Sequence, residues 1–284
     1  MRILVTGGCG FIGTNLIKRL LEDGHDVVSI DNYYTGFKSN EHDGAQYIHG
    51  DIREDGILDG IDNIDLIYHL AALARIQPSF EEPTPTIDTN TKGTQRVLEY
   101  ARQNNTPVVY AGSSSVHGNV HANPYSFSKW QGEELVKLYH QIYELPTIVC
   151  RFYNVYGPKQ LVDGPYCTVV GVFMKQYELN EDITITWDGE QRRDFTHVYD
   201  IVNGLILSGE KLVDRDVNGQ FFELGSGENY SINELADAFG EHPKVKIPKR
   251  PGEMRETLCV DTLANELLGW EPKENLIKWV KETI

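Results

Sequence analysis

The chain contains little sulfur, and what it has is not arranged to bind a metal. Its four cysteines, Cys9, Cys150, Cys167 and Cys259, are far apart and form no metal-ligand spacing. We expect Cys9 and Cys150 to lie in buried elements, where a reduced cysteine packs as a small apolar residue. This usage predicts no metal site, and it indicates a reducing compartment, the cytoplasm.

Long apolar segments and basic residues are also scarce. No apolar run is long enough to span a bilayer, and the first residues are typical of a strand rather than a signal peptide. Lys and Arg total 26 against 42 Asp and Glu, which gives a formal net charge of −16 in 284 residues. Such a surface repels nucleic acids and anionic membranes, so we expect neither as a partner. A small anionic ligand is still compatible if arginines and helix N-termini face its pocket.

The first part of the chain alternates predicted strands with predicted helices. A short aliphatic strand over residues 2–6 precedes a segment, 11–22, whose apolar residues recur at helical spacing. Further strands are expected near 26–31, 47–48, 66–68, 108–110 and 147–150, and helices over about 85–104 and 124–143. This alternation is typical of a parallel sheet covered on both faces. We therefore predict an α/β fold with a Rossmann-type doubly wound sheet.

The second part has shorter and more mixed segments. We expect helices near 166–177, 198–212, 231–239 and 275–283, and short strands near 183–185 and 221–224. Residues 1–151 are assigned to a dinucleotide-binding domain. Residues 152–284 are assigned mainly to a smaller α/β substrate-binding portion, with some exchange of chain between the two. No flexible linker separates them, so we expect a ligand cleft where they meet.

A glycine-rich turn between the first strand and the first helix predicts a dinucleotide site. Gly7, Gly10 and Gly13 would let the backbone turn tightly and bring a pyrophosphate to the helix N-terminus. Asp31 follows eighteen residues after Gly13, at the end of the second strand, where its carboxylate would bind the ribose hydroxyls of NAD. The same carboxylate would repel the additional phosphate of NADP. The alternative is a solvated aspartate at a strand end.

Two further segments fit the same site. Asp51 would contact the adenine edge, or alternatively would cap the N-terminus of a helix. The small residues of 69–72 end the fourth strand and would let the cofactor lie against the backbone. The alternative for this segment is a strand end that is merely close-packed.

Tyr125 and Lys129 lie four residues apart in a predicted helix, downstream of the serines of 113–115. On a helix this spacing places both side chains on one face, so an ammonium can lie close to a phenol. A neighbouring cation lowers the pKa of a tyrosine, which near 10 is otherwise a poor base at neutral pH. Beside a dinucleotide site, the pair predicts a base that takes a proton from an alcohol. Without that context, the pair would be two surface residues of a helix.

Jointly these motifs resemble those of the extended short-chain dehydrogenases/reductases, the family of NAD-dependent nucleotide-sugar epimerases and dehydratases. The resemblance runs nearly end to end. It is carried by residues 7–13, 31, 50–52, 69–72, 90–94, 113–118, 125–129, 151–158, 193–195 with 200, and 268–270. It implies NAD as cofactor, a nucleotide-diphospho sugar as substrate, and a homodimer paired through the helices expected at 85–104 and 124–143.

The resemblance also implies roles for individual residues. Ser113, which has the family's offset from Gly118, would bridge the substrate oxygen. Tyr125 would be the general base, and Lys129 would lower its pKa and hold the nicotinamide ribose. The implied cofactor contacts are Gly7, Gly10, Phe11, Ile12, Gly13, Asp31, Asn32, Asp51, Ile52, Leu70, Ala71, Ala72, Asn90, Tyr125 and Lys129. The implied substrate contacts are Ser113, Ser114, Tyr125, Asn154, Arg193 and Arg250, with Arg255 as a further candidate. The alternative for any one of these arginines is a solvated surface charge.

Ser114 and Ser115 narrow the expected reaction. In the family's 4,6-dehydratases an Asp-Glu pair follows the catalytic Thr, and its sugar-acid decarboxylases keep a Glu at the second place. Both places are serine here, so we expect reversible oxidation at one carbon, the 4-epimerisation of a UDP-hexose through a 4-keto sugar. The alternatives are a dehydratase or reductase of the same family, and a non-catalytic NAD-binding module.

The chain departs from the family near the expected sugar site. Only six residues separate Gly118 from Tyr125, and His117 stands where a tyrosine is common. The shortened loop predicts an open or differently shaped sugar pocket. Leu258 lies near the place where glucose-restricted epimerases carry a bulky aromatic residue, so an N-acetylated sugar is also compatible.

Overall fold

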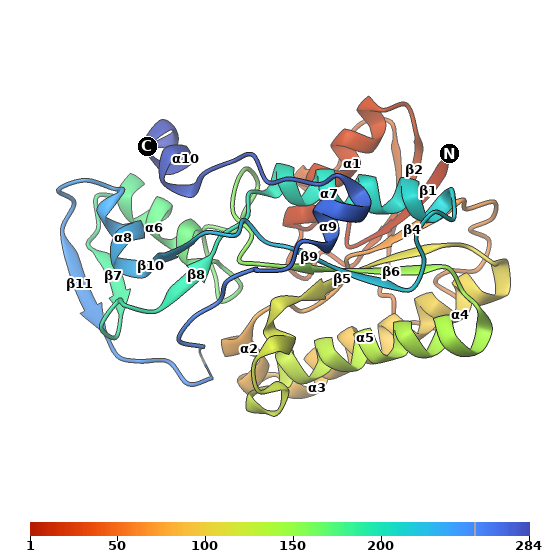
Figure 1. The fold of residues 1–284 in the computed structure, drawn as a ribbon, viewed down its shortest axis with the longest axis horizontal. Helices are drawn as coiled ribbons and strands as arrows, with labels where there is room; N and C mark the ends of the chain where they lie inside the picture. Colours follow the sequence, from red (N-terminus) through yellow and green to blue (C-terminus); the bar gives the residue numbers. More distant parts are fainter. Residues whose placement is uncertain (253) are drawn as a thin grey trace.

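Seven parallel strands form one sheet at the centre of the molecule (Figure 1). The computed structural model describes residues 1–252 and 254–284. The strands are β1 (Arg2–Thr6), β2 (Asp26–Asp31), β3 (Ala45–His49), β4 (Leu66–His69), β5 (Val108–Ser113), β6 (Thr147–Phe152) and β9 (Gln220–Leu224). Their spatial order is β3-β2-β1-β4-β5-β6-β9, so the order reverses between β1 and β4. In open α/β sheets a ligand binds beyond the carboxyl ends of the strands at such a reversal.

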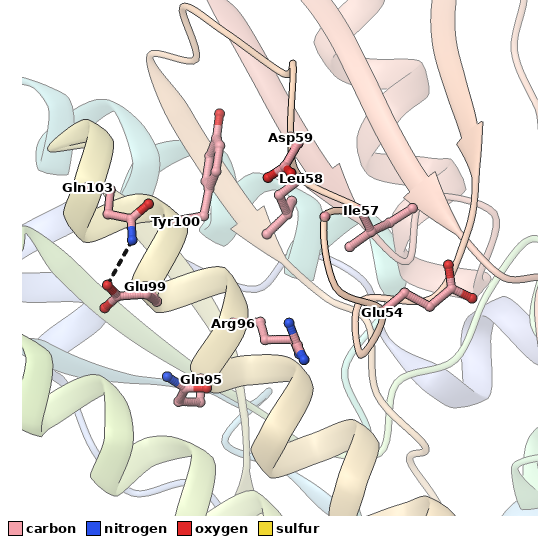
Figure 2. A pocket seen from close by; sticks show the side chains of 10 residues that line it. Glu54, Ile57, Leu58, Asp59, Gln95, Arg96, Glu99, Tyr100 and Gln103 are labelled. Carbon is pink, nitrogen blue, oxygen red and sulfur yellow. Dashed lines mark hydrogen bonds between the residues drawn. The ribbon is translucent and has the colours of Figure 1, made fainter.

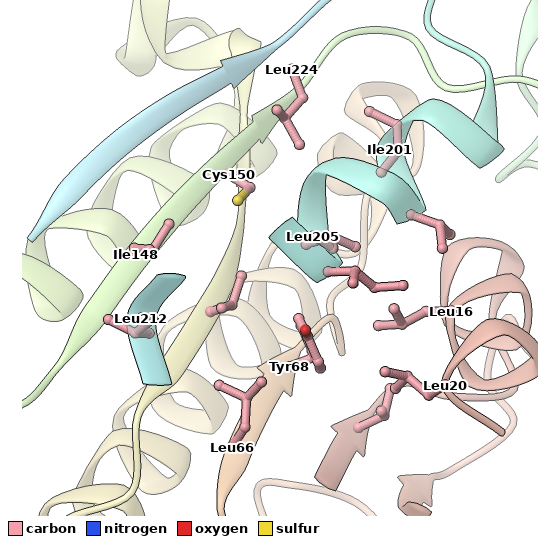
Figure 3. Packing of buried hydrophobic residues seen from close by; sticks show 14 of the residues in the cluster. Leu16, Leu20, Leu66, Tyr68, Ile148, Cys150, Ile201, Leu205, Leu212 and Leu224 are labelled. Atoms are coloured by element: carbon pink, nitrogen blue, oxygen red, sulfur yellow. The ribbon is translucent and has the colours of Figure 1, made fainter. Parts of the chain in front are cut away.

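Helices cover both faces of this sheet, which confirms the predicted fold class. On one face lie α1 (Phe11–Glu22) and α7 (Val198–Val213), and on the other lie α4 (Thr94–Asn104) and α5 (Pro124–Tyr143) (Figure 1). Successive strand residues point to opposite faces. The first face is filled by a cluster in which Leu16 and Leu20 of α1 and Leu205 of α7 approach Tyr68 of β4 (Figure 3). Cys150 packs in the same cluster, as the sequence predicted.

The helix expected over 85–104 is divided into three parts. A short helix, α3 (Pro83–Ile87), leads into a π-helical segment over Asp88–Gly93, and α4 follows. A π-helical turn accommodates one more residue than an α-helical turn and often occurs at functional sites. A further short helix, α2 (Ile76–Glu81), precedes α3 and was not predicted.

The remaining chain forms a smaller unit with its own apolar core. It contains α6 (Val169–Glu178), α8 (Ile232–Asp237), α10 (Leu276–Thr283) and two strand pairs, β7 (Ile183–Thr186) with β11 (Lys244–Ile247) and β8 (Arg192–Asp194) with β10 (Asn229–Ser231). A last short helix, α9 (Leu263–Leu268), packs beside α7 in the first cluster. The sequence did not predict β8, β10, β11 or α9, because elements of three to six residues carry little periodicity. Although β9 and α7 come from the second half of the chain, β9 is the last strand of the large sheet and α7 packs on one of its faces.

Within the described ranges, no helix combines the length and apolar character that a membrane span requires.

Candidate active site

The glycine turn packs backbone against backbone at the end of β1. Gly7 has a φ of +74°, and a Cβ there would lie 2.8 Å from the Ala71 nitrogen. A Cβ on Gly13 would lie 2.2 Å from the carbonyl oxygen of Gly7. Helix α1 follows, with Gly10 as its N-cap and no side-chain cap, so the first amides around Phe11 and Ile12 can receive an anionic ligand.

Asp31 is not a solvated residue, because only 9% of it is exposed. Its Oδ2 accepts a hydrogen bond from the Cys9 amide at 2.8 Å, and its Oδ1 accepts one from the Tyr33 amide at 2.7 Å. Burial raises the pKa of this carboxyl, while the two amides act against that rise. Asp31 therefore fixes the glycine turn, and each of its oxygens keeps a lone pair for a ribose hydroxyl.

Asp51 is held in a local network at the end of β3. It accepts hydrogen bonds from the amide of Arg53 at 2.9 Å, from the Arg53 guanidinium at 2.7 Å and from Asn32 Nδ2 at 2.9 Å. Arg53 lowers the pKa of Asp51 to about 2. Turns rather than a helix follow, so the helix N-cap alternative is not realised. Ile52 is buried beneath Gly93 of the π-helical segment.

The end of β4 lies beside the glycine turn. Leu70, Ala71 and Ala72 are partly exposed, and the amide of Ala71 donates to Thr6 Oγ1 at 3.2 Å. Asn90 is 1% exposed, and its amide group bonds both backbone polar groups of Leu73 (2.8 and 3.1 Å) and Ser128 Oγ (2.9 Å). Asn90 therefore holds the backbone that follows β4, and its influence on the cofactor passes through Leu73.

Ser113 and Tyr125, two of the predicted catalytic residues, lie within hydrogen-bonding distance of each other. The Tyr125 hydroxyl donates to Ser113 Oγ at 3.1 Å, and Ser113 Oγ donates to Ser115 Oγ at 3.0 Å. Ser113 ends β5, while Tyr125 lies in the first turn of α5, where Asn123 caps the helix by accepting from the Ser126 amide at 2.8 Å. One hydroxyl pair is thus placed by the end of a strand and the start of a helix.

Lys129 lies deeper, under β5, and this corrects one expectation. Its Nζ donates to the Ala111 carbonyl oxygen at 2.5 Å and to the Tyr110 hydroxyl at 3.0 Å, and burial lowers its pKa to about 8. Burial raises the pKa of Tyr125, and the groups that oppose this rise are Ser113 and Arg75 rather than Lys129. The expected lowering by Lys129 is therefore not found in this structure.

Arg75 is a site residue that the sequence did not reveal. It immediately precedes α2, and its guanidinium donates from Nε to the Tyr166 carbonyl oxygen at 2.7 Å and from Nη1 to the Ala74 carbonyl oxygen at 3.1 Å. Among the described residues no carboxylate pairs with it, so a cation without an acidic partner acts on Tyr125. No spacing connects the two, because Arg75 precedes Tyr125 by fifty residues.

Glu133 is a second unpredicted residue, although a signal was available. It continues the four-residue spacing of Tyr125 and Lys129 along α5, and only 2% of it is exposed. Its Oε1 accepts from the Ser113 amide at 3.2 Å, and its Oε2 accepts from the Arg151 guanidinium at 2.7 Å. Glu133 thus ties the backbone of Ser113 to β6.

The predicted substrate residues are less closely grouped. Ser114 is buried directly after Ser113. Asn154 Nδ2 donates to the Asp194 carbonyl oxygen at 2.8 Å, which places it against β8. Arg193 of β8 is partly buried, with Nη1 donating to its neighbour's carbonyl oxygen at 2.8 Å, whereas Arg250 is exposed beyond β11.

A small cavity of about 130 Å³ lies in the second unit, lined by Trp187, Gln191, Lys249, Met254 and Arg255. Lys249 Nζ lies 4.2 Å from the centre of the Trp187 ring, and the Arg255 guanidinium carbon lies 4.8 Å from it. Trp187 is 42% exposed and was not predicted as a site residue. The Arg255 guanidinium is also paired with Asp188 at 2.9 Å. An accessible aromatic ring with two cations over it is suited to a flat ligand that carries negative charge.

A larger cavity of about 340 Å³ lies between residues 54–59 and α4 (Figure 2). Figure 2 shows Arg96, Tyr100 and the hydrogen-bonded Glu99 and Gln103 along one wall. None of the predicted cofactor or substrate residues lines it, so it is separate from the site described above.

A parallel sheet that reverses beside a glycine turn, with a buried acid on β2 and a serine–tyrosine pair on β5 and α5, defines a dinucleotide-dependent short-chain dehydrogenase/reductase. Residues 3–225 match the model of the NAD-dependent epimerase/dehydratase family. The chain therefore belongs to this family of enzymes, and NAD is its cofactor. The close approach of Gly7 to Gly13 and the buried Asp31 fit that cofactor.

Individual relatives cover almost the whole chain. A putative UDP-glucose 4-epimerase of Methanocaldococcus jannaschii is 30% identical over 303 residues, covering 99% of this chain and 97% of the relative. A UDP-N-acetyl-alpha-D-glucosaminuronate decarboxylase of Bacillus cytotoxicus is 31% identical over 319 residues, covering 100% and 96%. The crystal structure of a UDP-glucose 4-epimerase of Thermotoga maritima with UDP-glucose is similar with a TM-score of 0.93 at 29% identity, covering 100% of this chain and 97% of that one. By their names, these relatives include both epimerases and a decarboxylase.

Proposed function

We propose that the protein is an NAD-dependent 4-epimerase of a nucleotide-diphospho sugar, most simply a UDP-hexose. The observation that carries the proposal is the Tyr125–Ser113 hydroxyl pair, 3.1 Å apart, with serines instead of acids at positions 114 and 115. When bound, NAD supplies a hydride acceptor that can return the hydride to the opposite face of the sugar. In this proposal residues 1–151 mainly bind NAD, and residues 152–284 mainly hold the nucleotide sugar.

The chain's own residues move and hold the proton. Tyr125 takes the proton of the sugar 4-hydroxyl and returns it after the 4-keto sugar has turned over. The Ser113 hydroxyl, already bonded to Tyr125, bridges to the same sugar oxygen and orients it. Lys129 holds the nicotinamide ribose, and Arg75 favours the phenolate.

The second unit provides groups suited to the nucleotide part of the substrate. We infer that the base stacks on Trp187, because this exposed ring is the aromatic wall of the small cavity. Arg193, Arg250 and Arg255 are the candidates for binding the diphosphate, since guanidinium groups meet phosphate oxygens in a bidentate fork. Asn154 lies against β8 and comes two residues after the end of β6.

Proton NMR of the purified protein with a panel of UDP-hexoses tests the reaction. A gluco and galacto mixture approached from either pure sugar, without accumulation of NADH, is the expected result. Loss of water from a UDP-hexose, or of carbon dioxide from a UDP-hexuronate added to the panel, would contradict epimerisation and assign a dehydratase or decarboxylase instead, as in the decarboxylase relative.

Two other functions make different predictions about the cofactor. A net reductase of a nucleotide sugar must exchange its cofactor, whereas an epimerase restores it in each cycle. Stoichiometric oxidation of added NADH to NAD during turnover would therefore favour the reductase. A non-catalytic NAD-binding module would have no use for the Tyr125–Ser113 pair, and an inactive protein that still binds NAD would favour it.

We also propose a homodimer in which α5 pairs with its copy. Leu138 and Ile142 lie four residues apart on this helix and are 46% and 63% exposed, and Trp130 and Tyr143 are exposed on the same helix. A single exposed apolar residue is ordinary, but a row along one helix is typical of an interface.

A further inference from the structure

A continuous hydrogen-bonded network of charged side chains runs from the catalytic serine to an exposed histidine. Glu133 accepts from the Ser113 amide at 3.2 Å, and Arg151 bonds Glu133 at 2.7 Å. The same guanidinium bonds Glu223 Oε1 of β9 at 2.9 Å, and His117 Nε2 bonds that oxygen at 2.9 Å. Four side chains from α5, β6, β9 and the turn after β5 thus join residues more than one hundred positions apart.

Among the four side chains of this network, only His117 has substantial exposure. Its side chain is 45% exposed, compared with 2% for Glu133, 8% for Glu223 and 20% for Arg151. Its ring stacks on Tyr153, with an angle of 27° between the planes. It lies only four residues after Ser113, in the 3-10 turn (Ser114–His117) that Ser113 begins. Solvent protons therefore reach the network at His117, in the turn that directly follows Ser113.

Each carboxylate of this network faces its own cations. Glu133 accepts from Arg151, and the buried Lys129 ammonium also acts on it; both cations oppose the rise in the pKa of Glu133 that burial causes. Glu223 is shared between Arg151 and His117, and both lower its pKa. When His117 loses its proton, Arg151 is the cation left to Glu223 among the described residues, and a buried carboxylate is costly without sufficient positive charge beside it.

We propose that His117 is a positioning residue for the reaction. Its imidazolium keeps Glu223, Arg151 and Glu133 in their hydrogen-bonded positions, and Glu133 thereby fixes the backbone of Ser113. The proposal rests on the catalytic role of Ser113 given above. His117 does not touch the reacting atoms, and acts through the network. Deprotonation of His117 loosens the Glu223 contact, lets Arg151 shift towards Glu223, and weakens the Glu133 bond to the Ser113 amide.

The direction of the pH effect follows from the groups around His117. Glu223 raises the pKa of His117 above its ordinary 6.5, with Glu133 acting in the same direction and both burial and Arg151 opposing. A raised pKa in the folded protein means that the contribution of the imidazolium is complete below pH 6.5 and is lost as the pH rises through the folded value. The pKa of Glu223 is lowered, so its carboxylate is already ionised over this range.

NMR titration of the NAD-loaded protein tests the coupling without any substrate. The 13C-labelled His117 ring is expected to titrate above 6.5, and Glu223→Gln is expected to lower that midpoint. The Ser113 amide nitrogen signal is expected to titrate with the same midpoint as His117 and to become independent of pH in His117→Gln. A Ser113 amide that ignores the titration of His117 would overturn the proposal, even if the substrate assignment were correct.

The pH profile of turnover supplies a second test with the active nucleotide sugar. His117→Gln keeps a hydrogen-bond donor but cannot carry the charge, so kcat should fall about 10-fold below the His117 midpoint and match the wild type above it, with KM unchanged. His121→Gln, which changes an exposed histidine of the following turn, is the matched control and should keep the wild-type profile. An unchanged kcat profile in His117→Gln would contradict the proposal. Failure to turn over any nucleotide sugar would instead contradict the proposed function, while the NMR result would still decide the role of His117.

Discussion

At the Tyr125 hydroxyl, burial and charge act in opposite directions. Burial raises the pKa of this tyrosine, whereas the Ser113 hydroxyl and the Arg75 guanidinium favour its ionised form. A tyrosine whose pKa lies far above neutral stays protonated near neutral pH. In that form it cannot take a proton from a sugar hydroxyl. The positive charge of oxidised NAD would act in the same direction as Arg75, so the complete site favours the phenolate more than the chain alone does.

Replacing Tyr125 with Phe should abolish proton transfer and leave cofactor binding intact. The ring stays, but the hydroxyl that bonds Ser113 is lost, so kcat should fall by about 10²- to 10⁴-fold. Turnover by NMR and NAD affinity by calorimetry check the two halves of this statement. Undiminished turnover would remove Tyr125 as the base.

Replacing Arg75 with Gln should move the acid limb of kcat/KM to higher pH. Loss of the cation raises the pKa of Tyr125 further, so a higher pH is needed to reach the phenolate. A full pH profile of kcat/KM measures the shift. Arg96→Gln, on the α4 wall of the larger cavity, is the control and should leave the limb in place. If the acid limb of kcat/KM lies at the same pH in the wild type and in Arg75→Gln, Arg75 does not alter the pKa of the base.

At the scale of elements, the contact between α5 and β5 positions Lys129. Gly132 of α5 faces the Tyr110 hydroxyl, and a Cβ at this position would lie 2.1 Å from that oxygen. The same hydroxyl accepts the hydrogen bond from Lys129. The helix can therefore approach the strand closely enough for Lys129 to reach the Ala111 carbonyl oxygen only because residue 132 has no side chain.

Gly132→Ala should destabilise the protein and weaken cofactor binding together. The new methyl group displaces Tyr110, so the free energy of unfolding should fall by about 1–3 kcal/mol. Tyr110→Phe removes the clashing oxygen, and the double variant should therefore lose less than the sum of the two single changes. Chemical denaturation and NAD titration of all four proteins measure this cycle. Strictly additive losses would show that the two residues do not clash.

At the scale of the whole molecule, α5 contributes both to the candidate active site and to the proposed dimer interface. The inward side of α5 carries Tyr125, Lys129 and Glu133, while its outward side presents Leu138 and Ile142 to solvent. A dimer formed through this outward side would rigidify the helix that holds the catalytic base. The opposite side of the sheet, covered by α1 and α7, has no equivalent role in the proposed pairing (Figure 1).

The double change Leu138→Glu and Ile142→Glu should convert the proposed dimer to a monomer. Charges placed at a desolvated interface oppose association. Multi-angle light scattering should give twice 32.2 kDa for the natural chain and 32.2 kDa for the variant. Leu179→Glu, at an equally exposed apolar residue after α6, should remain dimeric. A natural chain that is monomeric at micromolar concentration would refute the pairing.

The sequence by itself determined the features that depend on short stretches of chain. The glycines between β1 and α1, the acid at the end of β2 and the Tyr125–Lys129 spacing each follow from local geometry, and the alternation of strands and helices predicted the sheet. These signals are readable because a tight turn, a helix face and a strand period are set by neighbouring residues.

Only the tertiary structure decided which distant side chains meet. It turned Lys129 towards Tyr110 and Ala111, placed Arg75 where its charge acts on Tyr125, and joined Ser113 to His117 through Glu133, Arg151 and Glu223, by way of a last strand contributed from the second half of the chain. The physical reason is that such contacts depend on the order of strands in the sheet and on the depth of each side chain in it. Neither quantity is set by residues that are adjacent in the sequence.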